Sequence, residues 1–91
     1  MVTFESCDQV KIRGRPEIAS VQIFGEQDFG GPVGWIGLNQ SFDIDAPETV
    51  EPLTDNPAYI ERVRVLDDDL NELISARRSD EGDGCRDEVT E

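Results

Sequence analysis

Apolar and polar side chains alternate along several stretches of the chain, at the period of two residues that is typical of half-buried β-strands. The alternation is regular in residues 8–13. In residues 58–66 Ile60 fits it poorly, but Val63 and Val65 alternate clearly with Arg62 and Arg64. Residues 17–24 carry the same signal, with apolar residues on the second face as well, so this strand is expected to be buried or bent on both sides. Residues 33–38 predict a further short strand, whose glycines indicate a kink or a close backbone approach.

Glycine and proline interrupt these stretches and predict the connections. Residues 14–16, Gly-Arg-Pro, predict a turn, and residues 25–34, with four glycines and one proline, predict a mobile hairpin loop. Residues 39–57 are too rich in proline for a helix and too acidic for a core strand. We expect them to cross the surface as an extended segment. Four apolar residues would pin this segment down: Phe42, Ile44, Val50 and Leu53.

One helix is predicted near the end of the chain, over residues 68–78. Three aliphatic residues recur there at helical spacing: Leu70, Leu73 and Ile74. Asp69 and Glu72 match an acidic capping box, and two arginines follow where the helix dipole favours cations. Residues 79–91 hold six acidic residues and one aliphatic residue, too little apolar surface to offset the entropy of ordering. We therefore expect a single small β-rich domain over residues 1–78 and an acidic flexible tail over residues 79–91.

Together these elements predict a mainly β fold, either a small SH3-like barrel or a curved antiparallel sheet, with one short C-terminal helix. The strand residues from Val10 to Val21, followed by Gly34-Trp35-Ile36, look like the first three strands of many small barrels. This similarity is architectural and carries no family motif. The alternative is a small α+β sandwich, in which the helix covers one face of the sheet.

The charge of the chain restricts the classes of partner. Of 91 residues, 21 are acidic and 8 are basic, with no histidine, which gives a formal net charge of −13. The negative phosphates of a nucleic acid bind Lys and Arg side chains and would repel such an acidic chain. Direct nucleic-acid binding is therefore not expected. No apolar run approaches the ~18–20 residues of a membrane-spanning helix, and the first residues show no secretion signal. These features predict a cytoplasmic protein.

The two cysteines, Cys7 and Cys85, add little at this level. A bond between them would contribute roughly 4–5 kcal/mol by constraining the unfolded chain. Without a secretion signal, two reduced thiols are expected instead. The chain lacks histidine and any CxxC spacing, so a zinc site is not expected.

Charges of opposite sign are segregated along the sequence. Between Arg15 and Arg62 there is no basic residue, and the interval holds nine acidic ones: Glu17, Glu26, Asp28, Asp43, Asp45, Glu48, Glu51, Asp55 and Glu61. If the strands at residues 8–13 and 60–66 are neighbours, four cations would form one basic strip able to bind an anionic ligand: Lys11, Arg13, Arg62 and Arg64. The alternative is that these cations pair with nearby acids. A GC-rich genome or a salt-loving host would also produce an acidic, arginine-rich composition without any specific function.

No motif predicts an enzyme or a cofactor. The spacing Gly31-x-x-Gly34-x-x-Gly37 lacks the Lys-Ser or Lys-Thr pair of a phosphate loop. The run of aspartates at 67–69 fails the calcium-loop pattern, which requires Gly at its sixth position and Glu at its twelfth. The paired carboxylates lie in a polar, proline-rich segment, where a raised pKa for acid–base catalysis is not expected. We expect no catalytic residue, no metal site and no cofactor.

The remaining function is recognition of another protein. The sequence predicts a non-enzymatic module whose acidic face docks onto a basic partner surface, with acids at spacings comparable to those of nucleic-acid phosphates. In size and charge it resembles the small acidic inhibitors of host defence that viruses and mobile elements encode, so a nucleic-acid mimic that inhibits a DNA- or RNA-binding protein is one form of this hypothesis. The alternative is a small structural or accessory subunit of a larger assembly. The candidate binding residues are Asp43, Asp45, Glu48, Glu51 and Asp55 for electrostatics, with Trp35, Phe29 and Tyr59 as anchors.

Overall fold

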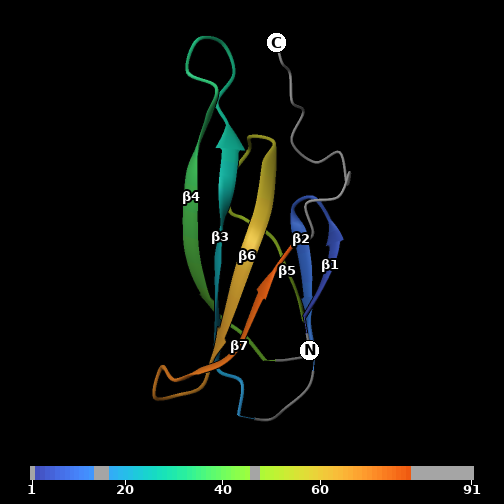
Figure 1. Cartoon of the computed structure of the whole chain (residues 1–91), viewed down its shortest axis with the longest axis vertical. Helices are drawn as coiled ribbons and strands as arrows, with labels where there is room; N and C mark the ends of the chain where they lie inside the picture. The colour runs from blue at the N-terminus through green and yellow to red at the C-terminus, as the bar shows by residue number, and fades with distance from the viewer. Residues whose placement is uncertain (1, 14–16, 46–47, 79–91) are drawn as a thin grey trace.

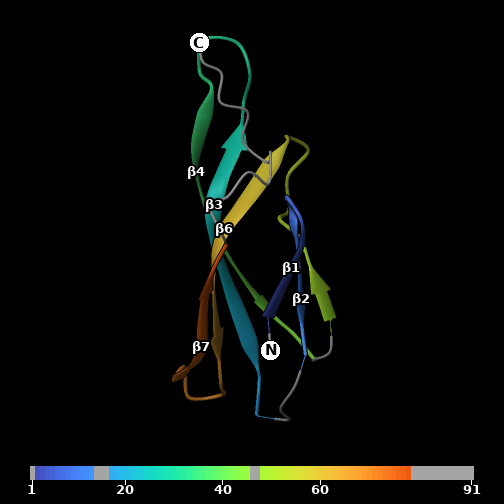
Figure 2. The same ribbon diagram turned by 45° about the vertical axis from the view of Figure 1, so that its right-hand side comes forward.

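The computed structural model describes residues 2–13, 17–45 and 48–78, which form seven β-strands and no helix. The strands are β1 (Val2–Ser6), β2 (Gln9–Ile12), β3 (Ser20–Asp28), β4 (Trp35–Asp43), β5 (Glu48–Val50), β6 (Ala58–Leu66) and β7 (Glu72–Arg77). They pair into two antiparallel sheets, one of three strands in the order β1-β2-β5 and one of four in the order β4-β3-β6-β7 (Figures 1 and 2). The described chain is elongated, with extents of 44 × 23 × 18 Å.

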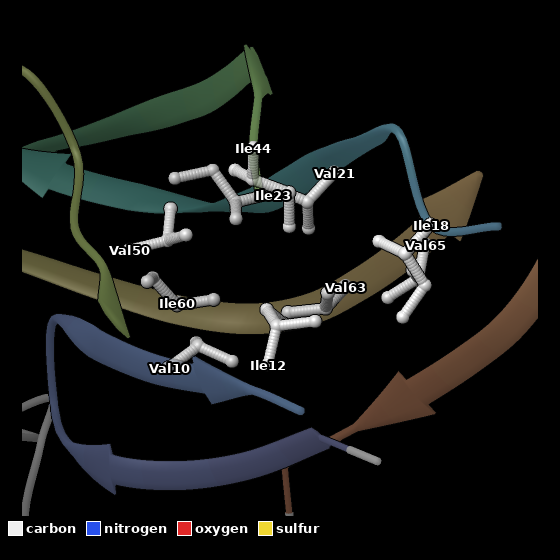
Figure 3. Packing of buried hydrophobic residues seen from close by; sticks show 10 residues of the cluster. All are labelled: Val10, Ile12, Ile18, Val21, Ile23, Ile44, Val50, Ile60, Val63 and Val65. Carbon is white, nitrogen blue, oxygen red and sulfur yellow. The ribbon is translucent and has the colours of Figure 1, made fainter. Parts of the chain in front are cut away.

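The inner faces of the two sheets share one apolar core. Val10 and Ile12 of β2 are fully buried and point toward the side chains of β3 and β6 (Figure 3). The rest of this cluster comes from both sheets and their connections: Ile18, Val21, Ile23, Ile44, Val50, Ile60, Val63 and Val65. Each fully buried valine or isoleucine stabilises the fold by about 1.5–3 kcal/mol. The alternation of apolar residues in β2 and β6 is therefore the pattern that holds the two sheets together.

The four predicted strands are confirmed, but the limits of three of them differ from the prediction. β2, β3 and β6 lie where the alternation predicted them, and β4 extends the expected strand at 33–38 as far as Asp43. The loop expected at 25–34 is shorter, because β3 continues to Asp28. β1 and β5 were not predicted as strands. No strand of one sheet pairs with a strand of the other within the described residues, so the sheets do not close into a barrel.

The predicted helix at 68–78 is wrong, as is the helix of the α+β alternative: this stretch forms a tight turn followed by β7. The Asp67 carboxylate accepts hydrogen bonds from the backbone N–H groups of Asn71 and Asp69, each at 2.9 Å. The bond from Asn71 is the main reason that the pKa of Asp67 lies below its ordinary value of 3.8. An aspartate that bonds its own downstream backbone favours a turn over a helix. Ile74 then pairs with Val65 of β6 across the sheet. The spacing of apolar residues along the sequence does not reveal such a partner on another strand.

Leu70 occupies a strained position in this turn. Its φ is +66°, in the left-handed region, and its side chain is 70% exposed, so it gains little from burial. We expect Leu70→Gly to raise the free energy of unfolding by about 1 kcal/mol, because glycine has no Cβ to clash in this region. Urea unfolding followed by circular dichroism measures the change. Leu70→Ala is the matched control, since it removes the exposed side chain but keeps the Cβ, and an equal gain from alanine would contradict the strain.

The residue that follows β7 connects the sheets. Arg78 is 7% exposed, and its Nε donates a hydrogen bond to the carbonyl oxygen of Ile60 in β6 at 2.7 Å. Its Nη2 donates to the carbonyl oxygens of Ser6 and Cys7 in the turn between β1 and β2, at 2.7 and 3.1 Å. The guanidinium also lies over the ring of Phe4, 4.7 Å from its centroid. One cation therefore holds the β1–β2 turn against β6.

Cys7 lies in the same β1–β2 turn, and it is disulfide-bonded. The expectation of two reduced thiols is therefore wrong. Cys85 and the whole predicted tail at 79–91 lie outside the described residues.

Candidate functional site

The hairpin of β3 and β4 projects beyond the rest of the described fold. The tip that joins the two strands reaches past the end of β6 and past the whole three-stranded sheet (Figure 1). β3 and β4 stay paired without a register shift from Ser20↔Asp43 to Asp28↔Trp35, so the hairpin is continuous up to its tip. This projecting hairpin is the feature of the described surface best placed to reach another molecule.

The tip, residues 29–34, is closed by its own hydrogen bonds. The Asp28 carboxylate accepts from the backbone N–H of Gly30 at 2.8 Å, and the N–H of Phe29 donates to the carbonyl of Gly34 at 2.9 Å. The N–H of Val33 donates to the carbonyl of Gly30 at 3.2 Å. Gly30, Gly31 and Gly34 all have positive φ, which glycine adopts without strain. The glycines of this loop thus build a hydrogen-bonded turn.

Large apolar side chains are exposed at this tip and beside it. Phe29 is 51% exposed, Val33 57% and Ile36 43%, while Trp35 is half-buried. Of the two aromatic anchors expected here from the sequence, Phe29 is the better presented one. The sequence analysis did not name Val33 and Ile36 as binding residues. Their position among glycines, in a segment without cations, could have indicated that they are exposed near a turn. Exposed apolar side chains gathered at one end of a molecule are typical of a docking surface.

The predicted acidic residues are divided between two places. Asp43, Asp45 and Glu48 line a shallow depression of about 460 Å³, together with Asp68 from the β6–β7 turn. Asp43 and Trp35 are the two ends of β4, so eight residues at ~3.3 Å each separate this acidic end from the apolar tip by roughly 26 Å. No group of acidic or cysteine side chains within the described ranges is arranged to hold a metal ion.

Glu51 and Asp55 lie in the segment between β5 and β6, which is attached to the hairpin. The side chain of Gln40 on β4 accepts a hydrogen bond from the N–H of Leu53 at 2.8 Å. Thr54 donates from its hydroxyl to the Gln27 side-chain oxygen on β3 at 2.7 Å. Both acids are exposed. The structure therefore places them alongside the hairpin, between its apolar tip and its acidic end.

Tyr59, the third expected anchor, occupies a different environment. It is half-buried on β6, and the guanidinium of Arg78 lies 5.7 Å from its ring centroid. Its ring thus forms part of the contact between the sheets. It lies apart from the residues exposed at the tip.

The basic strip expected from four cations does not form. Lys11 is on β2 in the three-stranded sheet, whereas Arg62 and Arg64 are on β6 in the four-stranded sheet. Arg64 donates to Glu72 at 2.8 Å, and Arg62 lies over the ring of Phe24 at 4.3 Å. For Arg64 the structure therefore shows the alternative expectation, in which a cation pairs with an acidic residue near it. Lys11 therefore does not continue a strip of cations with Arg62 and Arg64 on neighbouring strands.

No described helix is long and apolar enough to cross a membrane. Comparison with known proteins adds no relationship: no family model matches the chain, and no curated protein or solved structure is significantly similar to it.

Proposed function

We propose that this chain is a non-enzymatic protein-binding module that docks onto a basic partner through the β3–β4 hairpin. The observation that supports it is the hydrogen-bonded tip, which exposes Phe29 and Val33 at the end of a projecting hairpin. Residues 17–45 carry five acids and no cation: Glu17, Glu26, Asp28, Asp43 and Asp45. The tip supplies the apolar contact, and the acids select a basic partner.

The two parts act on different steps of binding. Fully burying an exposed phenylalanine or valine contributes about 1.5–3 kcal/mol, and these side chains start about half exposed, so each would add about half of that. Because the tip already makes its internal hydrogen bonds, binding need not form them, which lowers the entropic cost. The acids act mainly on the rate of association, which a complementary field raises by roughly 10–10³-fold and which salt reduces.

A nucleic-acid mimic is the narrower form of this proposal. Its support is the acidic end, where Asp43, Asp45 and Glu48 surround the depression beside Asp68. The partner would then be a DNA- or RNA-binding protein, and the acids would occupy the surface on which it binds phosphates. On this form of the proposal, adding nucleic acid releases the partner from the chain.

The proposal is tested by capture of partners from a native extract on the full chain, washed from about 50 mM to about 500 mM salt. We expect a basic partner that is released as salt rises. The double variant Phe29→Ser with Val33→Ser should capture at least about tenfold less of it, because the apolar anchors are gone. Leu70→Ser is the matched control, since it removes an exposed apolar side chain from another part of the surface.

Charge is tested separately with the triple variant Asp43→Asn, Asp45→Asn and Glu48→Gln. Its matched control neutralises three acids that do not line the depression: Glu5, Asp8 and Glu61. The first set should weaken capture more than the second. An acidic partner, or capture that survives high salt and both sets of substitutions, would show that the proposal is wrong.

The second candidate function is a subunit of a larger assembly, which the exposed tip also favours. In that case the hairpin inserts into a neighbouring subunit, and the interface is apolar and tolerant of salt. Light scattering on the isolated chain separates the two functions, since an assembly subunit should form oligomers and a docking module should remain a monomer. Location in the cytoplasm stays a prediction, and the disulfide at Cys7 weighs against it, because stable disulfides are typical of oxidising compartments.

A further inference from the structure

The outer side of β4 is an edge of the four-stranded sheet. β3 is the one strand paired with β4 among the described residues, and Figures 1 and 2 both place β4 at the margin of the sheet. In an antiparallel ladder, residues alternate between those that bond the partner strand and those that point their N–H and C=O groups away from it. Half of the backbone groups of β4 therefore face outward.

The hydrogen bonds at the two ends of the hairpin determine which residues of β4 point their backbone groups outward. The N–H of Ile44 donates to Ala19, and the N–H of Phe29 donates to Gly34, so the pairs just inside them, Ser20↔Asp43 and Asp28↔Trp35, are of the non-bonded kind. The ladder between them has no register shift, so the alternation holds throughout. The outward-pointing residues of β4 are then Trp35, Gly37, Asn39, Ser41 and Asp43.

This edge lacks the features with which proteins protect their sheet edges, which are short length, bulges, proline and charge. β4 has nine residues, no proline and one charged residue, Asp43, at its end. The other edge strands differ: β5 has three residues, β1 has a register shift, and β7 has a register shift and charged residues. β4 is thus the unprotected edge of the described fold.

We infer that β4 binds an extended segment of a partner protein as an added strand, and that this segment alternates basic and apolar side chains. The inference rests on the proposed docking function and names its mode of binding. Basic side chains on one face of the segment would lie near Asp43 and Asp28, while apolar ones on the other would cover Ile36. A second copy of the chain is disfavoured, because two-fold, antiparallel pairing of β4 with itself would bring Asp43 of each hairpin to the end that carries Asp28 of the other, without a cation from residues 17–45.

The probe is a synthetic peptide of about ten residues that alternates lysine and valine, long enough to pair along β4. It is titrated into the isotope-labelled full chain at about 150 mM salt and followed by NMR and amide hydrogen exchange. We expect the amides of Gly37, Asn39 and Ser41 to gain at least about tenfold protection. The amides of Leu38 and Gln40 already face β3 and should change little, which provides an internal control.

Two matched peptides separate pairing from charge. The same peptide with N-methyl groups on alternate residues keeps its charge but loses the donors that a ladder needs, so it should bind at least about tenfold more weakly. A glutamate-valine peptide should not bind. If the methylated peptide binds as tightly as the parent, strand addition at β4 is overturned. The proposed docking through the acidic residues and the apolar tip would still stand. Equal binding of the glutamate peptide would overturn the preference for a basic segment and the proposed function with it.

The chain offers a matched pair of variants at one outward-pointing position. Ser41→Pro removes an N–H that faces away from β3, which edge strands tolerate, whereas Ser41→Ala keeps that N–H. Proline should abolish peptide binding and alanine should preserve it, with thermal unfolding used to confirm that both variants fold. If proline unfolds the chain, the methylated peptide still decides the question. A dimer of the unmodified chain that Ser41→Pro dissociates would make a second copy the occupant and overturn the basic segment.

Discussion

Replacing Gly25 with alanine should lower the free energy of unfolding by about 3 kcal/mol, the upper end of the usual cost of overpacking. Gly25 lies on β3 at the register shift with β6. A Cβ built on Gly25 would overlap the carbonyl oxygen of Tyr59 and lie 3.0 Å from the Cα of Ile60. Because the obstacle is backbone rather than a flexible side chain, β3 and β6 must separate.

Gly37 on the neighbouring strand provides the matched control. A Cβ there would meet nothing within 4 Å, so Gly37→Ala should leave stability unchanged or raise it by about 0.5–1 kcal/mol through the entropy of the unfolded chain. Urea unfolding followed by circular dichroism measures both variants. If the two substitutions cost the same, the close approach of β3 and β6 is not what requires glycine at position 25.

Replacing Arg78 with methionine should also cost about 3 kcal/mol, since it removes charge-assisted hydrogen bonds and leaves buried acceptors unpaired. Methionine keeps much of the length and packing of the side chain. It cannot donate to the carbonyl oxygens of Ile60, Ser6 and Cys7, of which that of Ile60 belongs to a fully buried residue. The β1–β2 turn would then keep its backbone hydrogen bond from the N–H of Ile60 to the carbonyl of Cys7 but lose the bonds from Arg78, and the amides of that turn should exchange faster.

The adjacent arginine is the control for Arg78. Arg77 pairs with Glu61 at 3.0 Å, and its side chain is 62% exposed. Exposed ion pairs contribute little, so Arg77→Met should cost less than about 1 kcal/mol. Thermal unfolding of the two variants side by side measures the difference. Equal losses would mean that Arg78 acts through surface charge alone and not through the hydrogen bonds that it donates between the sheets.

The candidate site was only partly predictable from the sequence. The segment without cations and the aromatic residues Phe29 and Trp35 were visible in it, because charge and residue type are properties of the sequence. Their grouping was not, since β4 places Asp43 and Trp35 at its opposite ends. The position of β4 at the edge of its sheet could not be predicted either, because it depends on how all the other strands pair.

The sequence by itself determined the strands that carry the core. Alternation at a period of two gave β2, β3 and β6, because a strand with one buried face requires that period whatever its neighbours are. The tertiary structure decided between helix and strand at residues 72–77, where the spacing of Leu70, Leu73 and Ile74 indicated a helix. There the turn at Asp67 and the pairing of Ile74 with Val65 favour the strand. It also decided which sheet each strand joins, and so which cations, acids and apolar side chains share a surface, since those contacts join residues far apart in the chain.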